Sequence, residues 1–150
     1  MFSYRDYAKE LLRLNVNLEL VVSVHGHNAE IHDQITRVIG SFSQTIRGIK
    51  NICQLKKPPH LVEIRVVIHR LNYKFLTEIT KFIKKEFPKT DRLVYIFFEI
   101  EGQACKNIER LKLTYTQLFP FITKVYGLIR HFSDVRFYHF PLCTIPPKFF

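Results

Sequence analysis

The sequence of 150 residues contains few cysteines and no long run of apolar residues. Its three cysteines, Cys53, Cys105 and Cys143, are odd in number and far apart, which argues against a disulfide framework. No CxxC or CxxxCxxC motif is present, so the cysteines form no compact ligand set for a metal or an iron–sulfur cluster. No stretch approaches the roughly 18 apolar residues of a membrane-spanning helix. The first residues, MFSYRDYAKELL, also lack the apolar core of a signal peptide. We therefore expect a cytoplasmic protein without a membrane partner.

A glycine-rich phosphate loop is also missing, since the five glycines form neither a Walker motif nor a dinucleotide-binding motif. Hydrophobic residues make up 47% of the chain, and its length suits one domain with a buried core. The formal net charge of +10 would suit a nucleic-acid partner. However, the basic residues are spread along the chain, and no helix-turn-helix or RNA-binding pattern occurs. The charge therefore does not favour a nucleic-acid partner.

Apolar runs typical of strands alternate with apolar stripes typical of helices. The predicted strands are 18–24, 61–69, 92–100 and 135–140, and the predicted helices are 4–14, 41–55, 73–87 and 115–132. Leu20 to Val22 run together as in a strand buried on both faces, and Ser41 and Gln44 have capping-box spacing. The order predicts an α/β fold with a parallel sheet of about four strands and covering helices. We expect one domain over residues 1–140 and an irregular C-terminal tail over residues 141–150.

Polar side chains follow each predicted strand. They are Ser23, His25, His27 and Asn28 after the first strand, His69, Arg70 and Asn72 after the second, Glu99, Glu101 and Gln103 at the third, and His139 and Cys143 after the fourth. In parallel α/β folds, sites form where the carboxyl ends of the strands meet. The opposite strand ends carry fewer polar residues. This asymmetry predicts a functional site at the carboxyl ends.

Two interpretations of these polar residues stay open at this point. His25 and His27, with Glu99, His139 and Asp33 available as further ligands, could bind zinc or iron. A metal-dependent hydrolase would use His25, His27 and Glu99. Alternatively, they are loop residues that make local hydrogen bonds, with Asp33 or Asn28 capping a short helix.

A resemblance to a known family covers nearly the whole chain. The segment SVHGHNAEIHDQITRVIGSFSQTIRGIKNI resembles the fourth-strand region of radical S-adenosylmethionine (radical SAM) enzymes. In those enzymes a strand ending in S-x-x-G is followed by H-D, then G-S-F and a T-x-x-G-I helix. EIRVVIHRLNYKFLTEITKFI, VYIFFEIEGQA and FPLCTIPP resemble the later strands of the same family. The resemblance implies that residues 1–140 form the second half of a (β/α)6 partial TIM barrel.

In that family the barrel binds a [4Fe–4S] cluster through CxxxCxxC and S-adenosylmethionine through later strand ends. The reduced cluster converts S-adenosylmethionine to a 5′-deoxyadenosyl radical, which abstracts hydrogen from a substrate. The resemblance implies that Ser23 lies near the cofactor's ribose, Arg37 near its carboxylate or ribose, and Asn72 in the same pocket. The candidates for the substrate side are Glu99, Glu101 and Gln103. No residue is assigned to catalysis or to a metal.

The sequence departs from the family because the CxxxCxxC segment and the first barrel strands are missing. The resemblance therefore implies a fragment or half of a radical SAM enzyme that is inactive alone. S-adenosylmethionine is its expected cofactor, and a [4Fe–4S] cluster is expected only if the N-terminal half is supplied. The expected partners are that half or a second copy of the chain, because a half barrel leaves residues 18–23 as an exposed edge strand. The alternatives are the metal-dependent hydrolase using His25 and His27, and a basic nucleic-acid-binding module.

Overall fold

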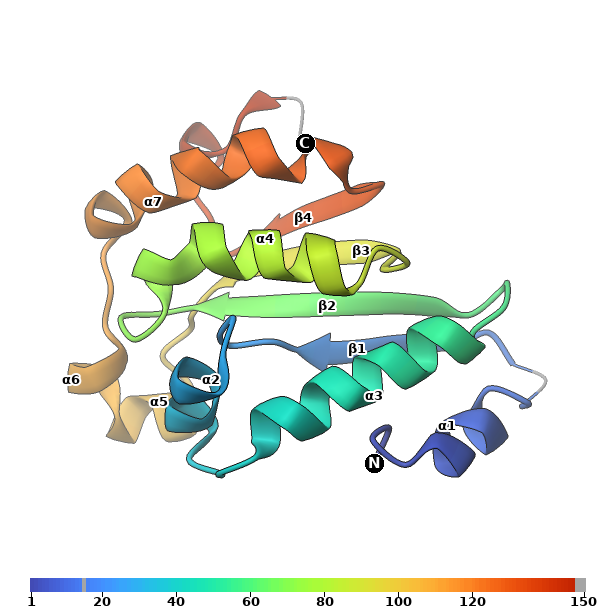
Figure 1. Cartoon of the computed structure of the whole chain (residues 1–150). Coiled ribbons are helices and arrows are strands. Elements are labelled where there is room, and N and C mark those ends of the chain that lie inside the picture. Colours follow the sequence, from blue (N-terminus) through green and yellow to red (C-terminus); the bar gives the residue numbers. More distant parts are fainter. Residues whose placement is uncertain (15, 148–150) are drawn as a thin grey trace.

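The computed structural model describes residues 1–14 and 16–147 and has an α/β fold (Figure 1). A four-stranded, all-parallel sheet lies at its centre, with the strands side by side in chain order. The strands are β1 (Glu19–Ser23), β2 (Leu61–Ile68), β3 (Arg92–Phe97) and β4 (Asp134–Tyr138). The predicted fold class, a parallel sheet of about four strands covered by helices, is therefore confirmed.

Seven α-helices occur among the described residues. They are α1 (Arg5–Leu11), α2 (Ala29–Thr36), α3 (Ser41–Leu55), α4 (Leu76–Glu86), α5 (Gln103–Lys106), α6 (Ile108–Leu111) and α7 (Tyr115–Leu128). Short 3-10 helices cover Tyr73–Phe75, Ile129–His131 and Leu142–Thr144. None of the helices in this part of the chain combines the length and apolar character needed to cross a membrane.

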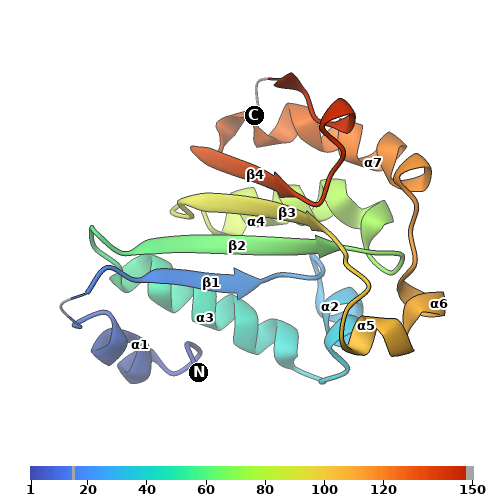
Figure 2. The same ribbon diagram turned by 180° about the vertical axis from the view of Figure 1, so that it is seen from behind.

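The three longest helices between successive strands, α3, α4 and α7, pack on one face of the sheet. Figure 1 shows α3, α4 and α7 in front of the strands, and in Figure 2, the view from behind, the strands lie in front of these helices. A doubly wound sheet would instead carry helices on both faces. Consecutive parallel strands with every connecting helix on the same side are the arrangement found in a (β/α) barrel.

The core lies between the helix-covered face and the three connecting helices. Because side chains alternate along a strand, every second residue of β2 points to this face and is fully buried. The main contributors are Val62, Ile64, Val66 and Ile68 from β2, Leu93 and Tyr95 from β3, and Ile49, Ile52, Ile79, Ile83, Leu118 and Ile122 from the helices. The Tyr95 hydroxyl lies 2.6 Å from the Thr80 hydroxyl of α4, which places Tyr95 on the helix side.

The opposite face of the sheet is left open by the connecting helices (Figure 2). β1 forms one edge of the sheet, as expected for residues 18–23 in a half barrel. The prediction that Leu20 to Val22 are buried on both faces is wrong, because Val21 points to the open face and is 38% exposed. A run of apolar residues does not distinguish an edge strand from a central one.

The C-terminal tail contains a 3-10 helix and packs back onto the domain. Ile145 is buried, and the hydroxyl of Tyr126 in α7 donates a hydrogen bond to the Thr144 carbonyl. Residues 148–150 lie outside the described residues.

Candidate functional site

Three histidines gather where β1 and β2 end. The backbone N–H of His25 donates to Nδ1 of His32 at 3.2 Å, and the two ring centres are 5.3 Å apart. The pKa of both His25 and His69 is lowered to about 4, mainly by burial and to a smaller extent by a neighbouring imidazole, that of His32 and His25 respectively. Both groups are therefore neutral near pH 7. Nδ1 of His69 accepts a hydrogen bond from the Leu71 N–H at 3.2 Å, whereas Nδ1 of His25 is buried without a hydrogen-bond partner in the described part of the chain.

Asn72 joins the carboxyl ends of the two strands from inside the protein. Its side-chain oxygen accepts a hydrogen bond from the His69 N–H at 3.0 Å. Its amide group donates to the Val67 carbonyl at 2.9 Å and to the His25 carbonyl at 3.2 Å. Asn72 is 0% exposed. The predicted cofactor-pocket residue therefore lies beneath the surface, where its carboxamide fixes the two loops.

The turn after β1 is shaped by Gly26 and Asn28. A side chain at Gly26 could not fit, because an added Cβ would lie 2.8 Å from both the Ile31 Cβ and the His32 nitrogen. The side chain of Asn28 caps α2 by accepting a hydrogen bond from the Ile31 N–H at 3.0 Å. The close approach of the turn to α2 thus depends on one glycine and one N-cap.

Asp33 holds the start of α3 from the preceding helix. Its carboxylate accepts hydrogen bonds from the N–H groups of Gly40 and Phe42, both at 2.7 Å, and from the Ser41 hydroxyl at 2.8 Å. The Phe42 N–H makes the largest contribution to lowering the pKa of this carboxyl group. The predicted capping box of Ser41 and Gln44 is wrong, because α3 begins after Gly40 without a capping side chain of its own. The simpler interpretation is confirmed for Asn28, which caps the short helix α2, whereas Asp33 lies within α2 and binds the start of α3.

Ser23 is the last residue of β1 and points to the open face of the sheet. Its register partner on β2 is Arg65, and it is half-buried. Within residues 1–14 and 16–147, its hydroxyl has no hydrogen-bond partner. Ser23 is therefore a donor and acceptor that a ligand on the open face could use.

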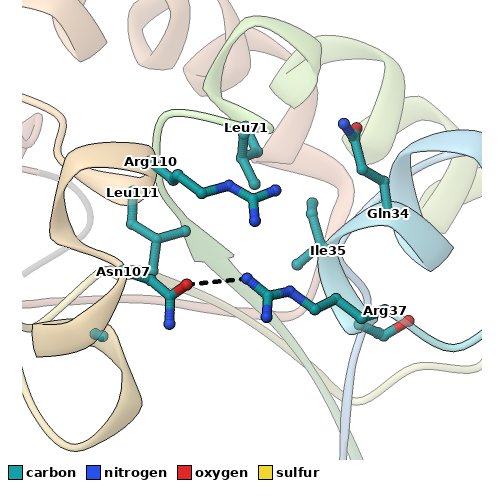
Figure 3. A pocket seen from close by; sticks show the side chains of 9 residues that line it. Gln34, Ile35, Arg37, Leu71, Asn107, Arg110 and Leu111 are labelled. Atoms are coloured by element: carbon teal, nitrogen blue, oxygen red, sulfur yellow. Dashed lines mark hydrogen bonds between the residues drawn. The ribbon is translucent and has the colours of Figure 1, made fainter.

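A cavity of about 420 Å³ lies beyond the carboxyl ends of β1, β2 and β3. It is lined by Gln34, Ile35, Thr36, Arg37, Leu71, Ala104, Asn107, Arg110 and Leu111 (Figure 3). An Nη atom of Arg37 donates to Oδ1 of Asn107 at 2.9 Å, which links the end of α2 to the segment after β3. Arg37 thus lines this cavity together with Arg110, whereas Ser23 and Asn72 are not among the lining residues.

Of the predicted substrate-side residues, Glu99 and Glu101 are not among those that line this cavity. Oε1 of Glu99 is 2.7 Å from Nδ1 of His139, so the loops after β3 and β4 contact each other there. Glu101 is exposed, and Gln103 begins α5 with a side chain outside what the structure describes.

The residues of the alternative metal site, His25, His27 and Glu99, do not form a metal-binding group in the described part of the chain. In the described part of the chain, no three His, Cys, Asp or Glu side chains are grouped so that they could hold a metal ion. Glu99 contacts His139, and the ring of His27 packs against Phe75 with 5.8 Å between the ring centres. Burial raises the pKa of the Cys53 thiol to about 11, which disfavours the thiolate form that binds metals.

A second polar cluster, not predicted from the sequence, lies at the amino ends of the strands. The guanidinium of Arg92 lies 3.0 Å from Glu63 and 2.6 Å from Asp134, and it also contacts Glu19. Glu63 further pairs with Arg65. The sequence does carry a signal for this cluster, because Glu63 and Arg65 are two positions apart in an apolar strand and therefore point to the same face of the sheet.

Asn107 and Arg110, which line one side of the cavity, were not predicted from the sequence. Their spacing of three residues places both on one side of a helical turn, which is the only local signal they carry. Comparison with models of known protein families gives no match, and comparison with curated proteins gives none either.

Proposed function

We propose that the chain is the S-adenosylmethionine-binding half of a radical SAM-type barrel. In this proposal, the chain is inactive until a segment carrying the cluster ligands completes the barrel. The observation that supports it is the winding of the sheet, in which consecutive parallel strands carry the three long connecting helices, α3, α4 and α7, on one face. A closed barrel is built by continuing this pattern until the two edge strands meet.

The open face of the sheet also fits the inside of a barrel. Parallel sheets are normally covered on both faces, yet here the face that carries Val21 and Ser23 has no helix layer (Figure 2). On that face the side chain of Glu63 is only 2% exposed, and it pairs with Arg65 and Arg92. Buried ion pairs and half-covered apolar residues on one surface suit an interior that a further segment completes.

The residues at the carboxyl ends have chemistry that suits the cofactor. The Ser23 hydroxyl faces the open side and can hydrogen-bond a ribose diol, while Asn72 holds the adjoining loop in place. When bound beside a cluster held by the other half, S-adenosylmethionine supplies the radical chemistry. The chain's own three cysteines are far apart in the sequence, so the proposal assigns the cluster to the partner segment.

Titration with S-adenosylhomocysteine, followed by NMR of the backbone amides, tests the proposal. We expect saturable shifts at the end of β1 and in the turn around Asn72, with an affinity weakened by the missing half of the pocket. Ser23→Ala should weaken binding by about three- to tenfold, the value of one hydrogen bond. Ser43→Ala, an exposed position on α3, is the matched control and should leave the affinity unchanged. Shifts that are absent at millimolar ligand, or equal loss in both variants, would contradict the proposal.

The origin of the missing half is tested independently by sequencing the DNA upstream of the Met1 codon. A CxxxCxxC motif followed by further strand–helix units, in the same or a shifted frame, is the expected result. Unrelated sequence there would leave a second copy or a separately encoded half as the partner that closes the sheet.

A further inference from the structure

The described residues that line the cavity beyond the strand ends supply two guanidinium groups and no carboxylate. Arg37 comes from the end of α2 and Arg110 from α6, and Figure 3 shows both side chains directed into the same space. Glu109, next to Arg110 in the sequence, pairs with Lys112 at 2.6 Å. No ion pair in the described part of the chain neutralises Arg37 or Arg110. Two like charges that face one cavity repel each other, and an anion between them would relieve that repulsion.

Arg37 is held in a backbone conformation that an arginine rarely adopts. It caps the end of α2 in the left-handed region, with φ 58° and ψ 26°, where glycine or asparagine is usual. In this conformation the side chain reaches across the cavity to Asn107. That contact uses one of the several N–H donors of the guanidinium, which leaves a donor fork directed at the cavity. An unusual backbone at a ligand-facing residue is common at binding sites.

The remaining walls combine amide and apolar groups. Gln34 and Asn107 supply carboxamides, while Ile35, Leu71 and Leu111 supply apolar surface. The volume of about 420 Å³ falls in the range of small-molecule sites. We infer that this cavity binds the oxyanion, phosphate or carboxylate, of a small molecule whose apolar part packs on the leucine and isoleucine side chains. Arginine forks suit either oxyanion because they donate two parallel hydrogen bonds.

This inference does not depend on the function proposed above, because Ser23 and Asn72 are outside the cavity lining. The test is calorimetric titration of the full chain at low salt with inorganic pyrophosphate, and separately with citrate. The stronger of the two probes identifies the preferred oxyanion. We expect Arg37→Gln and Arg110→Gln each to weaken the stronger probe by about tenfold or more, the range for a charge-assisted hydrogen bond.

The matched control is Arg47→Gln, which removes the same charge from an exposed position of α3. It should leave the affinity unchanged, and circular dichroism should show all three variants folded, since the replaced side chains are exposed. Equal weakening by the control would mean that only net charge attracts the probes, and no saturable binding would also overturn the inference. Displacement of the probe by S-adenosylhomocysteine would make the cavity part of the cofactor pocket and refute a separate site. Conversely, retained probe binding together with failed S-adenosylhomocysteine binding would refute only the function proposed above.

Discussion

Replacement of Asn72 by alanine provides the sharpest test of how the site is built. The side chain satisfies three backbone groups, the His69 N–H and the carbonyls of Val67 and His25. Asn72 is 0% exposed, so its carboxamide is shielded from water in the native protein. Asn72→Ala would leave the buried His69 N–H and two part-buried carbonyls without that partner.

The expected loss follows from these three contacts. A buried backbone group that loses its partner costs about 1–3 kcal/mol, and some groups recover a partner through small shifts or an admitted water. We therefore expect Asn72→Ala to lower the free energy of unfolding by about 3–5 kcal/mol. With a urea dependence of about 2 kcal/mol per molar, the unfolding midpoint should fall by about 2 M.

Urea unfolding followed by circular dichroism measures this change. Asn51→Ala is the control, because Asn51 is also buried and donates to the carbonyls of Phe2 and Ser3 at 3.0 and 3.3 Å. Both contacts hold the N-terminal segment, so the control should cost only about 1–2 kcal/mol. If Asn72→Ala lowers the free energy of unfolding by less than about 1 kcal/mol, the structural role of Asn72 is refuted. Contact with a ligand would then be the remaining role for Asn72.

Three further perturbations test other parts of the structure. Burial lowers the pKa of His25 and His69 from 6.5 to about 4, so the unfolded chain binds protons that the fold excludes. The free energy of unfolding should therefore be greatest above pH 6.5 and fall as the pH drops toward 4, by up to about 3 kcal/mol per group. The urea midpoint of His69→Gln should depend less steeply on pH across this range than that of the unaltered chain. An unchanged dependence on pH would contradict the lowered pKa of His69. Arg92→Met removes one of the two cations paired with the buried carboxylate of Glu63, so it should lower the free energy of unfolding by about 2–4 kcal/mol. An unchanged urea midpoint would contradict a stabilising role for these ion pairs. Arg37→Gly relieves a left-handed backbone conformation that costs an arginine about 1–2 kcal/mol. The greater entropy of glycine in the unfolded chain offsets part of this gain, so the thermal unfolding midpoint should stay the same or rise. Pyrophosphate binding should weaken, because the guanidinium is lost. A lower midpoint would refute that account.

The fold was predictable where the sequence pattern is local and continuous. The apolar run of β2, bounded by Pro59 before it and polar residues after it, predicted the strand to within one residue at its end. The exposure of Val21 in β1 did not follow from the apolar run, because exposure depends on what lies beside and over the strand; only the half-barrel resemblance predicted an exposed edge at residues 18–23. The cap of α3 was mispredicted for a similar reason, since Asp33 reaches the helix start from the helix before it.

The site was predictable only strand by strand. Sequence order placed Ser23 and Asn72 after successive strands, and the structure places their segments next to each other. The hydrogen bond between Arg37 and Asn107 was not predictable, because 70 residues separate them in the sequence. They meet only because the strands pair in parallel, which places the segments after β1 and β3 at the same end of the sheet. The sequence therefore indicates the correct end of the sheet, whereas the cavity that forms there depends on the tertiary fold.

The Arg92 cluster constrains the kind of surface that could cover the open face. Arg92 is already paired with Glu19, Glu63 and Asp134 on that face. A partner bringing further charge to the amino ends would have to break these pairs, and a buried carboxylate that loses its cation is costly. A partner with apolar side chains could instead cover Val21 without disturbing the pairs. Closure of the face would then be driven by apolar contact and by backbone pairing along β1, while the charged cluster keeps its present partners.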